Sequence, residues 1–148
     1  MCGIAGVHRR TGAPVRKLNA LTTELLLAIE NRGKDATGYV AIDDDGGIQL
    51  EKICIPASAF VGKKRRIRSD ARTVLLHTRF ATTGNRKATV DAHPQVYGDV
   101  FCVHNGTIWN DDALFRDWDL PRRARVDSEI VPASVSEGSG WDDVAGAL

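Results

Sequence analysis

The chain begins with residues 1–8, Met-Cys-Gly-Ile-Ala-Gly-Val-His, a short apolar run broken by glycines. Such a run predicts a buried strand that starts almost at the first residue. Cys2 stands at the head of that strand, so the predicted fold carries a thiol at its extreme N-terminus.

Beyond this strand, the pattern becomes helical and then returns to β. Leu18 to Glu30 has apolar residues near helical spacing, which predicts an amphipathic helix that ends at residues 31–33. Thr37 to Ile42 and Ile48 to Pro56 predict two strands. The Asp- and Gly-rich residues 43–47 between them suit a tight turn, so we expect an antiparallel pair.

The second half continues this alternation. Thr73 to Thr78 and Val100 to His104 predict central strands, while Asp111 to Trp118 and Ser128 to Ser136 look helical. Trp141 to Leu148 resembles the start of another helix, and no strand follows it. The whole pattern predicts an α+β layered fold.

Composition limits the number of domains, the partners and the compartment that can be expected for the protein. Its 148 residues suit one domain, and its formal charge of +1 provides no global field for nucleic acid or an anionic membrane. The three cysteines have no CxxC spacing, and no apolar run is long enough to span a bilayer. We therefore expect a cytoplasmic protein with no membrane partner.

Residues 63–68 form a basic patch, which fits a solvated loop better than a nucleic-acid site because no aromatic residue interleaves it.

The position of Cys2 allows its thiol and a free α-amine to lie on the same terminal residue. Its small side chain permits removal of Met1, after which the thiol and a free α-amine belong to one residue. The ordinary pKa of an α-amine is about 7.7–8.0 and that of a thiol about 8.5, so the amine can act as base for its own side chain. The alternative is that Cys2 is a small buried hydrophobe of the first strand.

Six short segments extend the argument along the chain. They are residues 1–6 (MCGIAG), 32–38 (RGKDATG), 77–84 (HTRFATTG), 92–94 (AHP), 104–106 (HNG) and 127–129 (DSE). Their order and spacing resemble those of class II glutamine amidotransferases. Segments 77–84 and 92–94 are most similar to the glutaminase domain of glucosamine-6-phosphate synthase.

The resemblance implies a fold and a domain organisation. The fold would be the four-layer αββα sandwich of the N-terminal-nucleophile hydrolases. Residues 1–148 would form one glutaminase domain, apparently shortened at the C-terminus because the chain stops before the last strands expected of that sandwich.

The resemblance also implies the catalytic residues. Cys2 would attack the side-chain amide of glutamine and form a γ-glutamyl thioester. Asn105 and Gly106 would form the oxyanion hole, one through its side-chain amide and the other through its backbone N–H. Taken alone, Asn-Gly is also a strong hairpin signal.

Substrate binding is implied at three positions. Arg79 would clamp the α-carboxylate of glutamine, Asp127 would pair with its α-ammonium, and Thr82 would contact the substrate. The alternatives are a surface salt bridge for Arg79 and a helix N-cap for Asp127. Residues 79–89 would close over the substrate. In this loop Phe80 stands where the family usually has tryptophan, and Thr83 stands where it usually has histidine. These differences bear on how the loop closes and leave the thiol chemistry intact.

Supporting roles fall on residues beside the nucleophile. Arg32, Gly33 and Asp35 would help to position it, and His104, like the other histidines of these motifs, would make structural hydrogen bonds. Cys54 and Cys102 are expected to be inert strand residues. No metal and no cofactor are expected.

These expectations define competing functions. The first is an active glutaminase that uses L-glutamine as its substrate and passes ammonia to a synthase. Its expected partner is a separate synthase subunit or a second copy of the chain in a homo-oligomer. The second is a non-catalytic relative that binds glutamine or a protein. The third is a cysteine–histidine hydrolase, which is disfavoured because a nucleophile at residue 2 needs no imidazole.

Overall fold

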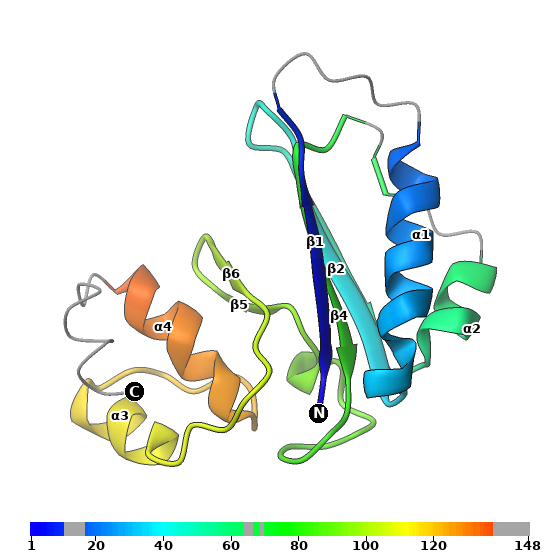
Figure 1. The fold of residues 1–148 in the computed structure, drawn as a ribbon. Coiled ribbons are helices and arrows are strands. Elements are labelled where there is room, and N and C mark those ends of the chain that lie inside the picture. Colours follow the sequence, from blue (N-terminus) through cyan, green and yellow to red (C-terminus); the bar gives the residue numbers. More distant parts are fainter. Residues whose placement is uncertain (11–16, 64–66, 69, 138–148) are drawn as a thin grey trace.

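The computed structural model describes residues 1–10, 17–63, 67–68 and 70–137 (Figure 1). Its larger sheet contains β1 (Gly3–His8), β2 (Ala36–Ile42), β3 (Ile48–Ile53) and β4 (Thr73–Arg79), in the order β1-β4-β2-β3. All neighbouring strands are antiparallel. The central strand β4 pairs through Thr78 with Gly3 on one side and with Thr37 on the other, so the end of β4 lies beside the N-terminus.

Two helices cover one face of this sheet, α1 (Leu18–Ile29) and α2 (Ala57–Gly62) (Figure 1). A short 3-10 helix, η1 (Glu30–Arg32), continues α1. Alternate residues of the strands face these helices, as the two-residue period of a strand requires. The core between them is apolar and includes Leu26, Tyr39, Phe60, Val74 and Leu76.

The opposite face of the sheet carries a smaller unit. β5 (Gln95–Tyr97) and β6 (Val100–Cys102) form an antiparallel pair, and α3 (Asp111–Asp117) and α4 (Ile130–Ser136) pack with it (Figure 1). The shared core of this unit comprises Tyr97, Ile108, Phe115, Ile130 and Ala133. Two 3-10 helices, η2 (Thr89–Asp91) and η3 (Asp127–Glu129), lie in its connections.

The two units approach each other closely around His93. Its ring stacks on the ring of His77 of β4 with 4.2 Å between centroids. A Cβ on Gly38 would lie only 2.0 Å from the carbonyl oxygen of His93, so only glycine permits this approach. Lys52 of β3 donates to the carbonyl oxygens of Val90, Ala92 and Pro94 at 2.8–3.2 Å. These contacts fix segment 90–94 against the larger sheet.

The predicted α+β class with antiparallel sheets is confirmed, and so are the helix from Leu18 and the paired strands around residues 43–47. The strand predicted to reach Pro56 ends at Ile53, because the chain turns there and the N–H of Ile55 donates to the carbonyl of Ile53. Cys54 therefore lies outside the strand and is half-buried.

The strand predicted at Val100 to His104 is shorter and is not central. It ends at Cys102 and, within the described residues, pairs only with the three residues of β5. The helix predicted from Ser128 starts as η3 and becomes α-helical at Ile130. Residues 141–148, with their predicted helix, lie outside the described part of the chain, as do residues 64–66 of the basic patch.

Candidate active site

Cys2 and Asn105 meet where the head of β1 reaches the segment that follows β6. The backbone N–H of Cys2 donates to Oδ1 of Asn105 at 2.9 Å. Asn105 is exposed, and Cys2 is half-buried. The segment around Asn105 runs on toward α3 without forming a hairpin, so the hairpin alternative is wrong.

The thiol of Cys2 lies against the main chain that follows β4. The N–H of Phe80 points at Sγ with a distance of 3.4 Å, and Sγ lies 3.6 Å from the carbonyl oxygen of Phe80. The Phe80 side chain is half-exposed and leaves these main-chain groups free to contact the sulfur. The loop after β4 therefore touches the thiol directly.

Residues 32–35 lie under this loop. Nε of Arg32 donates to the carbonyl oxygen of Cys2 at 3.0 Å. A Cβ on Gly33 would lie 2.3 Å from the carbonyl carbon of Arg79, so the chain can pass here only as glycine. The carboxylate of Asp35 accepts the N–H of Ala81 at 2.8 Å. The segment thus holds both the main chain of Cys2 and the loop above it.

His104 and Gly106 flank Asn105. Nδ1 of His104 lies 3.0 Å from the hydroxyl of Ser128, which fixes the ring. A Cβ on Gly106 would approach Nε2 of His104 to 2.7 Å. Gly106 lines the same small cavity as Cys2.

A buried histidine pair lies behind the cavity. Burial lowers the pKa of His77 to about 4 and, with further repulsion from His77, lowers the pKa of His93 to about 2. Both rings are therefore neutral at pH 7. Both ring nitrogens of His93 and Nδ1 of His77 are buried without a hydrogen-bond partner in the described structure, so neither ring is arranged as a base for Cys2.

Arg79 is buried, with only 3% of its surface exposed. Its Nη2 donates to the carbonyl oxygen of Thr83 at 2.6 Å, and its Nη1 donates to the carbonyl oxygen of Asn85 at 3.1 Å. The alternative of a surface salt bridge is wrong, because the guanidinium faces inward and binds main-chain carbonyls. Both arms of the fork point at the loop of residues 80–89.

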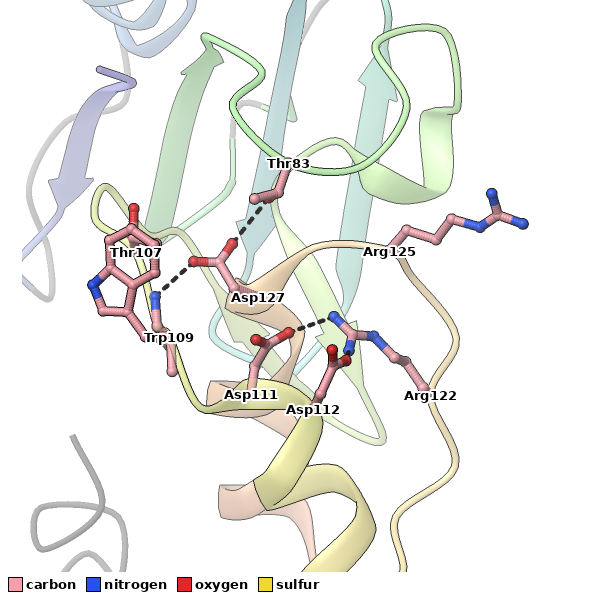
Figure 2. Close-up of a pocket in the computed structure, with 9 residues that line it drawn as sticks. Thr83, Thr107, Trp109, Asp111, Asp112, Arg122, Arg125 and Asp127 are labelled. Atoms are coloured by element: carbon pink, nitrogen blue, oxygen red, sulfur yellow. Dashed lines mark hydrogen bonds and ion pairs between the residues drawn. The ribbon is translucent and has the colours of Figure 1, made fainter.

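Asp127 is the first residue of η3, and its carboxylate points away from the helix. Oδ2 accepts the backbone N–H of Ile108 at 2.8 Å, and Oδ1 accepts the hydroxyl of Thr83 at 3.2 Å (Figure 2). No side-chain hydrogen bond caps η3. The capping alternative for Asp127 is therefore wrong.

One small cavity brings together most of the residues that the sequence singled out. Its lining includes Cys2, Arg79, Thr82, Gly106 and Asp127. A larger cavity lies on the other side of Asp127 and Thr83, which line both. In the larger cavity Arg122 pairs with Asp111 and Asp112, and Arg125 points away from it (Figure 2).

Some residues with prominent contacts at the site were not among the expected ones. Thr83 stood out only as a departure from the usual loop, and Phe80 contributes main-chain rather than side-chain atoms. Lys52 was not singled out. A contact made by a backbone carbonyl leaves no signal in residue identity, so sequence patterns could not reveal these partners.

The described residues contain neither a cluster of potential metal ligands nor a helix that could span a membrane. No group of three or more His, Cys, Asp or Glu side chains lies close enough to hold an ion in the ranges that the structure covers. None of the described helices has the length and apolar character needed to cross a bilayer.

Comparison with known proteins gives the class of enzyme to which the chain is similar. No protein-family profile matches it. The chain is 30% identical to a glutamine–fructose-6-phosphate aminotransferase (isomerizing) of Sulfurisphaera tokodaii over 93% of its own length and 23% of that protein. It is 29% identical to the enzyme of the same name from Yersinia pestis over 99% of its length and 23% of that protein. The resemblance to glutamine amidotransferases is thereby confirmed.

A second kind of relative carries a different name. The chain is 30% identical, over its whole length, to 32% of a 7-cyano-7-deazaguanine synthase from Saccharolobus solfataricus. The chain thus spans a third or less of the curated relatives described here. Both kinds of relative share a stretch of sequence with this chain.

Proposed function

We propose that this chain hydrolyses the side-chain amide of L-glutamine to glutamate and ammonia, with Cys2 as the nucleophile. The observation that carries the proposal is the junction of the Cys2 main chain with Asn105, beside a thiol that faces a small cavity. The active form is the chain without Met1. Met1 is 75% exposed, which makes it accessible to an aminopeptidase.

The proposed reaction needs only groups of Cys2 for proton transfer. The α-amine takes the thiol proton as Sγ attacks the amide carbon, and a tetrahedral oxyanion forms. Collapse breaks the C–N bond, and the ammonium returns its proton to the departing nitrogen, which leaves as ammonia. Water then cleaves the γ-glutamyl thioester, giving glutamate and the free thiol.

Asn105 and Gly106 are suited to bind the oxyanion. Asn105 uses Oδ1 to hold the nitrogen of Cys2, so its Nδ2 is the group that can donate to the substrate oxygen. The second donor would be the backbone N–H of Gly106, a residue that lines the cavity with Cys2. Because the Cys2 nitrogen and the oxyanion would share one side chain, base and oxyanion hole would be positioned together.

The amino-acid head group of glutamine would bind between Arg79 and Asp127, next to Thr82. Arg79 presents a buried two-armed donor, and Asp127 presents a buried carboxylate, to the same region. The two opposite charges, both in contact with Thr83, are complementary to the α-carboxylate and α-ammonium of a free amino acid. A peptide-bound glutamine lacks both charges and would leave the two side chains unpaired.

We further propose that residues 1–148 form a glutaminase domain of the four-layer αββα type. The order of helices, larger sheet, smaller sheet and helices in Figure 1 is consistent with that proposal. The names of the relatives describe different reactions, because one names fructose 6-phosphate as a reactant and the other names 7-cyano-7-deazaguanine as a product. The ammonia would therefore pass to an acceptor on a synthase, as a separate subunit or within an oligomer.

The test is glutamate formation by protein of known N-terminal mass. Trimmed protein should release equal amounts of glutamate and ammonia from glutamine, and Cys2→Ser should abolish this release while it keeps the fold. Cys54→Ser is the matched control and should retain the activity. Glutamine binding without any glutamate release would instead support the non-catalytic alternative.

A further inference from the structure

Thr83 makes two contacts that a bound amino acid would also make. Its carbonyl oxygen accepts Nη2 of Arg79 at 2.6 Å, and its hydroxyl donates to Oδ1 of Asp127 at 3.2 Å. The second arm of Arg79 is held by Asn85. One exposed loop residue thus presents an acceptor to the buried cation and a donor to the buried anion.

We infer that Thr83 is a specificity-determining residue that occupies the amino-acid subsite itself and is displaced when glutamine binds. The inference rests on the proposed role of Arg79 and Asp127. The α-carboxylate of glutamine supplies acceptors to Arg79, as the Thr83 carbonyl does, and the α-ammonium supplies a donor to Asp127, as the hydroxyl does. Both ligands cannot hold the same two groups at once.

The exchange can be local because the loop is anchored on both sides of Thr83. The N–H of Ala81 donates to Asp35 at 2.8 Å, and the N–H of Asn85 donates to Asp91 at 2.6 Å. These anchors involve neither Arg79 nor Asp127. Residues 82–84 can therefore move between two fixed points. Gly84 lies in this stretch with φ +69°, a backbone conformation that glycine adopts readily.

Displacement of Thr83 also changes access to the thiol. Thr83 and Asp127 line both the cavity at Cys2 and the larger cavity beside Trp109 (Figure 2). Their hydrogen bond joins two residues that line both cavities, so we expect its loss to open one cavity toward the other. Only a ligand with both a carboxylate and an ammonium replaces both contacts, which couples recognition of a free amino acid to opening of the thiol site.

The experiment compares Thr83→Val, which loses the hydroxyl, with Thr83→Ser, which keeps it. Binding of glutamine and of glutaramic acid, which is glutamine without its α-amine, is measured by calorimetry in a Cys2→Ser background. Removing a competing hydrogen bond to a carboxylate should tighten glutamine binding about tenfold in Thr83→Val. Glutaramic acid can replace only the Thr83 carbonyl on Arg79 and leaves the hydroxyl on Asp127, so it should gain no affinity in Thr83→Val. Thr83→Ser should keep the wild-type preference between the two ligands.

A second arm uses no amino acid. Alkylation of Cys2 by iodoacetamide, followed by peptide mass, should be faster in Thr83→Val than in Thr83→Ser, with Cys54 and Cys102 as internal references. If no variant binds glutamine, the proposed function fails and the alkylation rates alone decide whether Thr83 closes the site. Equal alkylation rates, unchanged or weaker glutamine binding in Thr83→Val, or an equal gain for both ligands would overturn the inference.

Discussion

The backbone nitrogen of Cys2 lies 2.9 Å from Oδ1 of Asn105, although 103 positions separate the two residues in the chain. The contact joins the first strand of the larger sheet to the segment after β6 of the smaller one. It also orients the Asn105 amide, because the oxygen is engaged and the nitrogen is left to donate. The proposed base and oxyanion hole therefore depend on one interaction between the two sheets.

Asn105 gives a test that separates its two proposed tasks. Asn105→Ala removes both the acceptor for Cys2 and the donor for the oxyanion, whereas Asn105→Asp keeps the acceptor. If the donor matters, both variants should lose about 10²–10³-fold in kcat with little change in the Michaelis constant for glutamine. Steady-state kinetics of folded protein measure this. Near-normal kcat in Asn105→Asp would restrict the residue to holding the Cys2 nitrogen.

Removal of Met1 should control activity. The nitrogen of Cys2 is a peptide nitrogen while Met1 is attached, and a peptide nitrogen cannot accept the thiol proton. We expect glutaminase activity to rise in proportion to the trimmed fraction when the protein is treated with methionine aminopeptidase. Intact mass gives the fraction and glutamate release gives the activity. Full activity in protein that retains Met1 would contradict the α-amine mechanism.

Arg79→Lys should weaken glutamine binding about tenfold or more, because one ammonium cannot offer the α-carboxylate the two-armed donor of the guanidinium. The change is measured as the Michaelis constant together with thermal stability. Arg122→Lys is the matched control, since Arg122 also binds two partners but pairs with carboxylates of α3. An equal kinetic effect in both variants would mean that the loss at Arg79 is not specific to the substrate site.

The stacked histidines predict acid destabilisation. The unfolded imidazoles bind protons below about pH 6.5, whereas burial keeps the pKa of His77 at about 4 and that of His93 at about 2 in the folded protein. The unfolded state thus binds more protons as the pH falls from about 6.5 toward 4. The free energy of unfolding should fall by about 1.4 kcal/mol per pH unit for each histidine.

Urea unfolding between pH 7 and pH 5 measures this slope, above the range where most carboxylates titrate. His93→Gln removes one of the two groups and should reduce the slope by about 1.4 kcal/mol per pH unit. His8→Gln is the control, because His8 is exposed at the far end of β1 and lies outside the buried pair. A slope that His93→Gln does not alter would show that the pair is protonated in the fold.

Local patterns in the sequence determined much of the fold. The helix from Leu18 and the strands that flank residues 43–47 form where apolar spacing and turn residues predict them, because neighbouring residues set both the period and the turn. The motifs also identified residues that converge on one cavity, among them Cys2, Arg79, Gly106 and Asp127. Residue identity carries the chemistry of a side chain, so these candidates could be found without a structure.

Tertiary structure alone decided which atoms these residues meet. The pairing of β1 with β4 and the contact of Cys2 with Asn105 depend on packing between distant segments, and no local period encodes either. The contact of the Thr83 carbonyl with Arg79 and the contact of the Phe80 N–H with the thiol use backbone atoms, which every residue type possesses. The sequence therefore determined the chemical groups of the site, while packing decided that Thr83 contacts both Arg79 and Asp127.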